Sequence, residues 1–286
     1  MRIQPFKLAE LQFAWCNRVY VRSRTHYRKP LPSLEKLQTT ILAERMQPYG
    51  IQVLELATNA IEFRVLLSLL PTESVSAAAS KTKGRISKWL SEQEPTQRND
   101  KTLARGYFAV TTGQSTRDAF EAYLNKQSEH HGYANRARPP IFVRQVSHSD
   151  QSRQALQTDH AVTLLRYHLV LATWFRRGVF GDMTAAVVTD YWLRLQGEHG
   201  FLIEKVSFLP DHVHLAICLH PTRSPAEILV ALMNAAQETM WERFEDVVVR
   251  SRVERLWQSS GFIGSFGELT SNAVIASIAR WTGLRD

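Results

Sequence analysis

One stretch of this chain occurs twice, and this repeat limits the possible folds more than any other feature of the sequence. Residues 50–71 align with residues 200–221 at a constant offset of 150, without a gap. Gly50 falls on Gly200, and Pro71 falls on Pro221. Because internal repeats of this kind mark repeated structural units, we expect two copies of one domain. A chain of 286 residues with 44% hydrophobic content is large enough to bury two cores.

The second copy contains two histidines in an apolar setting. Leu209-Pro210-Asp211 precedes His212 and His214, and an apolar run follows at residues 215–219. Residues two apart in a strand leave the same face, so both imidazoles can bind one metal ion. The alternative is two satisfied surface or core histidines, but the Pro-Asp turn and the apolar run favour a metal pair near the mouth of a sheet. We expect Asp211 to point away from His212 and to serve in a turn or cap.

The first copy contains a different candidate pair. Tyr123 and Gln127 lie four apart in residues 115–127, a segment with Ser and Thr at its expected N-cap. Helical spacing of this kind puts a phenol and a carboxamide on one face. The alternative is a partly exposed tyrosine on an ordinary amphipathic helix.

The first copy keeps the histidine strand but not the histidines. At the offset of 150, Glu62 stands where His212 stands, and Arg64 stands where His214 stands. Upstream, residues 21–30 resemble residues 169–178, which gives each copy a first strand followed by a basic turn.

The second copy, in turn, lacks the tyrosine and the glutamine. We match Gly106-Tyr107-Phe108 with Gly261-Phe262-Ile263, an offset of 155. On that count Ile278 replaces the tyrosine and Thr282 replaces the glutamine. Each copy therefore carries the part of a site that the other has lost.

These motifs resemble the HUH single-tyrosine transposases of small insertion sequences and their relatives, the REP-associated tyrosine transposases. The resemblance implies an α+β fold with two tandem ferredoxin-like or RRM-like domains, antiparallel sheets and helices on one face. It also implies an intramolecular pseudo-dimer. We expect one domain at residues 1–132, a linker at residues 133–160 and the second domain at residues 161–286.

In the insertion-sequence enzymes, the tyrosine helix of one subunit can complete the histidine site of the other. The resemblance therefore implies one composite site, with Tyr123 as the nucleophile and a divalent ion, Mg²⁺ or Mn²⁺, held by His212, His214 and Gln127. We expect a single-stranded DNA endonuclease and strand transferase that forms a 5′-phosphotyrosine on hairpin-marked DNA. The alternatives are a catalytically idle DNA-hairpin-binding protein and an unrelated His-x-His metallohydrolase.

Charge is divided unevenly between the two copies. Residues 1–143 carry 21 Lys and Arg against 12 Asp and Glu, a balance of +9, whereas residues 144–286 carry 14 against 15, a balance of −1. The first copy is therefore expected to bind DNA. The candidate DNA-binding residues form two basic clusters, Arg22, Arg24, Arg28 and Lys29 in one, and Lys81, Lys83, Arg85 and Lys88 in the other. The second cluster is equally consistent with a solvated helix face.

Three tryptophans, Trp89, Trp174 and Trp192, fit either base stacking or core packing, and core packing is the more usual role.

The chain shows no apolar signal core and no run long enough to cross a bilayer. We therefore expect a cytoplasmic protein. The resemblance further implies that it binds single-stranded or hairpin DNA and acts as a monomeric pseudo-dimer.

Overall fold

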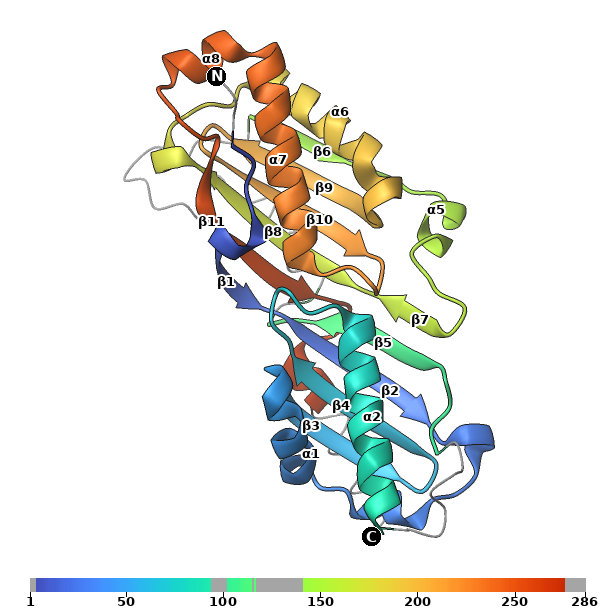
Figure 1. Cartoon of the computed structure of the whole chain (residues 1–286). Helices are drawn as coiled ribbons and strands as arrows, with labels where there is room; N and C mark the ends of the chain where they lie inside the picture. Colours follow the sequence, from blue (N-terminus) through green and yellow to red (C-terminus); the bar gives the residue numbers. More distant parts are fainter. Residues whose placement is uncertain (1–3, 94–101, 115, 117–140, 276–286) are drawn as a thin grey trace.

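The computed structural model of this protein describes residues 4–93, 102–114, 116 and 141–275. It contains two β-sheets, one above the other in Figure 1, each with helices packed on it. The first half of the chain forms β1 (Gln12–Cys16), β2 (Arg18–Arg24), α1 (Thr39–Met46), β3 (Gln52–Asn59), β4 (Glu62–Ser68), α2 (Val75–Gln93) and β5 (Tyr107–Thr112). The second half forms β6 (Phe142–Gln145), α5 (Asp150–Gln154), β7 (Ala161–Leu164), β8 (Arg166–Thr173), α6 (Asp182–His199), β9 (Phe201–Leu209), β10 (His212–Leu219), α7 (Pro225–Arg243), α8 (Glu245–Arg250) and β11 (Trp257–Phe266).

Most neighbouring strands in both sheets are antiparallel. The five-stranded sheet has the order β3-β4-β2-β5-β7, and the six-stranded sheet has the order β1-β11-β8-β10-β9-β6. The β5–β7 and β1–β11 pairs are parallel. Two such sheets with helices packed on one face make an α+β fold of two tandem domains, as the sequence predicts.

Each sheet takes its outermost parallel strand from the other half of the chain. β1 precedes β2 by a single residue, Asn17, yet β1 pairs with β11 of the six-stranded sheet. Likewise β7 precedes β8 by a single residue, Leu165, yet β7 pairs with β5 of the five-stranded sheet. The first extended segment of each copy therefore runs through both sheets (Figure 1).

The hydrogen bonds between the two copies include reciprocal pairs, as in the interface of a symmetric dimer. The Ser76 amide donates to the Pro221 carbonyl at 2.8 Å, and the Ala226 amide donates to the Pro71 carbonyl at 3.1 Å. Both bonds join residues related by the offset of 150. The two copies are therefore arranged as an intramolecular pseudo-dimer.

Helices cover one face of each sheet. On β10, Val213, Leu215 and Ile217 are fully buried in the main core together with Leu229 and Leu232 of α7. In Figure 1, α2, α6 and α7 lie on the same side of the molecule. The opposite side of each sheet, here called its distal face, therefore looks in a common direction. On β10, the alternation of a strand places His212 and His214 on the distal face.

After β5 and after β11, the chain crosses toward the other copy. Gly113 forms a β-bridge with Thr270, and Thr116 forms one with Gly267. The two bridges are reciprocal when Gly113 is equated with Gly267 and Thr116 with Thr270, which is an offset of 154. The offset of 155 predicted for this part of the repeat is therefore wrong by one residue. The backbone pairing between the two copies determines which residues are equivalent. The shared glycine of the two sequence motifs does not.

The crossing after β11 leads to the distal face of the five-stranded sheet. Residues 271–275 are helical, and Val274 packs there against Ala57 and Leu66. This segment of the second copy thus covers part of the first copy's sheet (Figure 1).

Part of the predicted linker, residues 133–160, forms regular structure. β6 extends the six-stranded sheet beside β9, and the short helix α5 is capped by the Ser149 side chain. Among the described residues, no helix is long and apolar enough to cross a membrane.

Candidate functional site

His212 and His214 begin β10 on the distal face of the six-stranded sheet. A two-residue turn joins β9 to β10, and Leu209 pairs with His212 across it. The two imidazole ring centroids lie 5.1 Å apart. Only 1% of His212 and 3% of His214 is exposed. Both rings therefore lie on one face of the sheet, as the sequence predicts from their spacing.

Asp211 contacts the first of these rings. The His212 Nδ1 atom lies 2.6 Å from Asp211 Oδ1, and the Arg176 Nε atom lies 2.8 Å from Asp211 Oδ2. Asp211 lies in the turn before β10, as the sequence predicts. The prediction that it points away from His212 is wrong, because the alternation of a strand does not apply in a turn. A carboxylate on one nitrogen of an imidazole fixes the ring and directs the other nitrogen toward a metal.

A third histidine contacts the second ring. His168, on β8, has its Nε2 atom 2.9 Å from His214 Nδ1, and the two rings stack at 5.2 Å between centroids. Burial lowers the pKa of His168 to about 3, so this imidazole is neutral at physiological pH. His168 is not among the predicted site residues, because it lies in an apolar strand. The only signal is that it alternates with Tyr167 and Leu169, which face the core.

The donor set fits a divalent metal ion. With Nδ1 of each ring engaged by Asp211 or His168, Nε2 is the atom through which His212 and His214 would bind the ion. Neutral imidazoles are common ligands of first-row divalent metals. Within the part of the chain that the structure describes, no group of three His, Cys, Asp or Glu side chains could hold a metal. The predicted third ligand, Gln127, is a carboxamide.

Four predicted site residues lie outside the described residues, namely Tyr123, Gln127, Ile278 and Thr282. With the corrected offset of 154, Ser277 and Trp281 take the places assigned to Ile278 and Thr282. On either count, the second copy has neither a tyrosine nor a glutamine at these positions.

In the first copy, an ion-pair cluster stands where the second copy has its histidines. Arg22 donates to Glu62 Oε2 through Nε and Nη2, at 3.0 and 2.6 Å. Arg64 donates to Glu62 Oε1 through the same two atoms, at 2.9 and 2.7 Å. The Arg24 Nε atom lies 3.9 Å from the same carboxylate. Burial alone would raise the pKa of Glu62, but the hydrogen bonds and charges of Arg22 and Arg64 outweigh it and lower the pKa.

The two basic clusters lie on opposite sides of the five-stranded sheet. Arg22 and Arg24 alternate along β2 with Val21, which is buried in the core beneath α2. They therefore project from the distal face. The cations of the other cluster are on α2, where Lys81 pairs with Glu73 at 2.7 Å and Arg85 lies over the ring of Tyr49. Arg28 and Lys29, in the turn after β2, are exposed, as is Lys88 on α2.

Two of the three tryptophans are core residues. Trp192 is fully buried and donates from Nε1 to the Leu232 carbonyl at 2.9 Å, and Trp89 is 5% exposed. Trp174 is partly buried and packs against the same core. Core packing is therefore confirmed for Trp89 and Trp192.

The chain is similar to proteins of one known family in two separate segments. Two segments, residues 19–127 and 161–279, each match the family described as "Transposase IS200 like". The ISDra2 transposase TnpA of Deinococcus radiodurans is 24% identical over 106 residues, which span 37% of this chain and 76% of that protein. A crystal structure of a candidate transposase from Deinococcus radiodurans R1 is 23% identical and covers 45% of this chain and 96% of that chain, with a TM-score of 0.36. Since the family matches both copies and more than half of the chain, this protein belongs to the IS200-like transposases, a family of DNA-processing enzymes.

Proposed function

We propose that this protein cuts and transfers single-stranded DNA at one composite site, which joins Tyr123 of the first copy to the histidine pair of the second. The observation that carries the proposal is the reciprocal crossing after β5 and β11. The segment after β11 reaches the distal face of the other copy's sheet, where Val274 packs. The matching segment after β5 crosses in the opposite direction at Thr116, and it leads to Tyr123. By the same symmetry, we expect Tyr123 to approach the distal face that carries His212 and His214.

In the proposed reaction, Tyr123 is the nucleophile. Its oxygen forms a bond to the scissile phosphorus while the bond from phosphorus to the 3′ oxygen breaks. The phenol loses its proton, and the departing 3′ oxygen gains one. The products are a 5′-phosphotyrosine and a free 3′-hydroxyl, so no water is consumed and the phosphoryl group can be passed to another strand.

A phenol with an ordinary pKa of about 10 is a poor nucleophile at neutral pH, so the phosphate must be polarised. A divalent ion, Mg²⁺ or Mn²⁺, would supply this Lewis-acid chemistry when bound. His212, His214 and Gln127 would hold it. Asp211 and His168 fix the two rings, so that both Nε2 atoms are held in place before DNA binds.

The proposed substrate is single-stranded DNA marked by a hairpin, and the proposed active form is the monomer, because one chain holds both halves of the site. The direct test is incubation with a labelled single-stranded oligonucleotide that contains a hairpin, in the presence of Mn²⁺, followed by a denaturing gel. We expect a labelled band that migrates with the protein. The Tyr123→Phe variant should lose this band and keep DNA binding. If the wild-type protein binds the hairpin and forms no adduct, it is a catalytically idle hairpin-binding protein and the proposal is wrong.

A mixing experiment tests whether the site lies within one chain. His212→Ala and Tyr123→Phe chains should each be inactive, and a mixture of the two should stay inactive if each site is built from a single chain. Recovery of the covalent band on mixing would instead place the two halves on different chains.

A further inference from the structure

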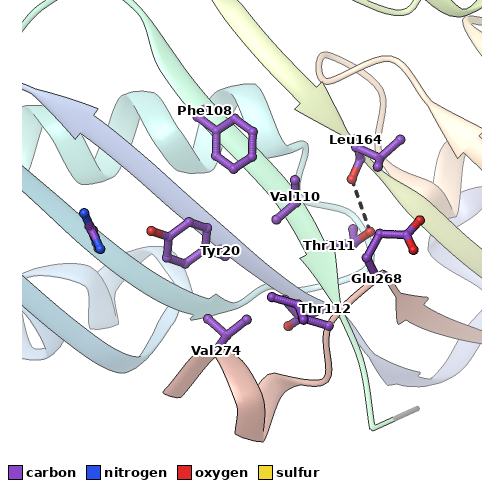
Figure 2. Close-up of a pocket in the computed structure, with 11 residues that line it drawn as sticks. Tyr20, Phe108, Val110, Thr111, Thr112, Leu164, Glu268 and Val274 are labelled. Atoms are coloured by element: carbon purple, nitrogen blue, oxygen red, sulfur yellow. Dashed lines mark hydrogen bonds between the residues drawn. The ribbon is translucent and has the colours of Figure 1, made fainter. Parts of the chain in front are cut away.

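A cavity opens on the distal face of the five-stranded sheet, beside the ion-pair cluster of Glu62. It has a volume of about 330 Å³ and lies between β2, β5 and the segment that follows β11 (Figure 2). The residues that line it include Tyr20, Arg64, Phe108, Val110, Glu268 and Val274. The cavity therefore occupies, in the first copy, the region equivalent to the histidine site of the second.

The lining of the cavity is mostly apolar and includes two aromatic rings. Tyr20 and Phe108 meet edge to face, with their centroids 6.4 Å apart. Figure 2 shows both rings bordering the cavity, together with Val110 on β5 and Val274 on the segment after β11. Burial raises the pKa of Tyr20, so its hydroxyl remains a hydrogen-bond donor. Glu268 also lines the cavity, and its carboxylate pairs with Arg166 at 2.5 Å. A ligand with a planar ring and a few polar atoms at its edge would fit this apolar, aromatic lining with its few polar groups.

Positive charge continues from the cavity along the same face. Tyr20, Arg22 and Arg24 are spaced two residues apart on β2, so their side chains follow one another at about 6.6 Å intervals on the distal face. Glu62 is a single carboxylate among Arg22, Arg24 and Arg64, so the cluster keeps a net charge of +2. The side chains of Arg22 and Arg24 remain 35% and 43% exposed. Glu62 thus orients the arginines and does not cancel their charge.

We propose that this region is a nucleotide-binding subsite, in which the cavity takes one unpaired base of a DNA strand and the arginine cluster binds the adjacent phosphate. The proposal rests on the proposed function only in taking single-stranded DNA as the ligand. An apolar cavity with aromatic rings alone would suit many small molecules, but the row of arginines beside it selects a ligand that joins a flat ring to an anion. Base stacking and phosphate contact are the two elements of sequence-tolerant single-strand binding.

The subsite gives the first copy a role that complements the second. Where the second copy has a histidine pair for metal chemistry, the first copy has fixed guanidinium groups for phosphate. Because both distal faces look in a common direction (Figure 1), one strand held at the first copy can extend toward the histidines of the second.

Filling the cavity tests the base contact. Val110 is partly buried and lines the cavity, so Val110→Trp should block it. The probes are a twelve-nucleotide oligothymidine and an abasic oligomer of the same length and charge, and binding is measured by fluorescence anisotropy in EDTA. We expect Val110→Trp to weaken oligothymidine binding roughly 5- to 150-fold, the loss of one stacked base, and to leave abasic binding unchanged. Val249→Trp is the matched control, because Val249 is 59% exposed on α8.

Removing one cation tests the phosphate contact. The slope of log affinity against log salt is negative. Arg24→Ala should make it less steep by about 0.7 for single strands, because one phosphate contact is lost. Arg45→Ala is the matched control, since Arg45 pairs with Glu92 on the helix side of the same sheet. An equal change in both variants would overturn the phosphate assignment.

A crosslinking experiment keeps the proposal testable if Val110→Trp folds poorly. Oligothymidine with 5-iodouracil, irradiated on the wild-type protein in EDTA, should attach to Tyr20 or Phe108, as mapped by mass spectrometry. Attachment only at other residues, or equal losses of oligothymidine and abasic binding in Val110→Trp, would refute the subsite. These assays contain no metal, so they can succeed where the nicking assay fails, and the nicking assay can succeed where they fail.

Discussion

The two groups that orient the histidine rings should control metal affinity without binding the metal themselves. Asp211→Ala removes the carboxylate 2.6 Å from His212 Nδ1, and His168→Phe removes the nitrogen 2.9 Å from His214 Nδ1. Loss of such an outer partner typically weakens metal binding by about 10- to 100-fold, which corresponds to about 1.4 to 2.7 kcal/mol. Asp211→Ala also leaves the Arg176 guanidinium without the carboxylate that it pairs with at 2.8 Å, and this charge opposes a cation. We therefore place this variant toward the upper end of the range.

The effects of the two changes should couple. The two rings lie 5.1 Å apart and would hold the same ion, and neighbouring sites with a shared partner do not combine additively in free energy. The double variant should bind Mn²⁺ more weakly than either single variant, by a factor that differs from the product of the two single effects. His168→Gln offers an amide oxygen in place of the imidazole nitrogen and should recover part of the affinity.

The assay is a titration of free Mn²⁺ by electron paramagnetic resonance, in the absence of DNA, with thermal unfolding followed by circular dichroism to check the fold. His220→Phe is the matched control, because His220 follows β10 directly and its Nδ1 atom contacts Thr222 at 2.7 Å, away from the pair. Unchanged Mn²⁺ affinity in both single variants, or an equal loss in His220→Phe, would refute the assignment of Asp211 and His168 as orienting groups.

Three further predictions concern stability. A Cβ atom at Gly267 would overlap the Thr111 carbonyl oxygen, so Gly267→Ala should lower the free energy of unfolding by about 1 to 3 kcal/mol in a urea titration. Gly84, in α2, has nothing within 4 Å of such an atom. Gly84→Ala should therefore raise the free energy of unfolding by about 0.5 to 1 kcal/mol. A loss of stability at both glycines would contradict the reasoning. Glu62→Gln removes charged hydrogen bonds to two arginines and should cost about 1 to 3 kcal/mol at pH 7. Because the folded pKa of Glu62 is lowered, this difference should be fully present above the unfolded pKa of about 4.3 and should shrink as pH falls through the folded pKa; a difference that persists unchanged at pH 2 would contradict an ionic origin.

The sequence predicts those features that depend on repetition and on spacing within one strand. The offset of 150 between the copies is reproduced by the reciprocal bonds of Ser76 and Ala226, and the rings of His212 and His214 share a face as two residues of a strand must. Both inferences need only local geometry and self-comparison.

Features that arise between distant strands could not be predicted in the same way. His168 reaches His214 because β8 and β10 pair, and the two residues are 46 positions apart. The exchange of β1 and β7 depends on single residues, Asn17 and Leu165, at which an apparently continuous strand changes sheets. Arg22 and Glu62 have no pattern that pairs them along the chain, although each is conspicuous on its own. The identity of a partner is thus set by pairing of strands, which local periodicity does not encode.

The strand exchange between the two sheets also fixes how the protein responds to dilution. A dimer of separate chains that shared strands in this way would dissociate at low concentration and would expose the backbone edges of β11 and β5, which are prone to aggregation. Here both partners of each exchanged pair travel on one polypeptide, so their effective concentration stays constant at any copy number. A cell that makes only a few molecules of this protein would therefore still have every one of them assembled.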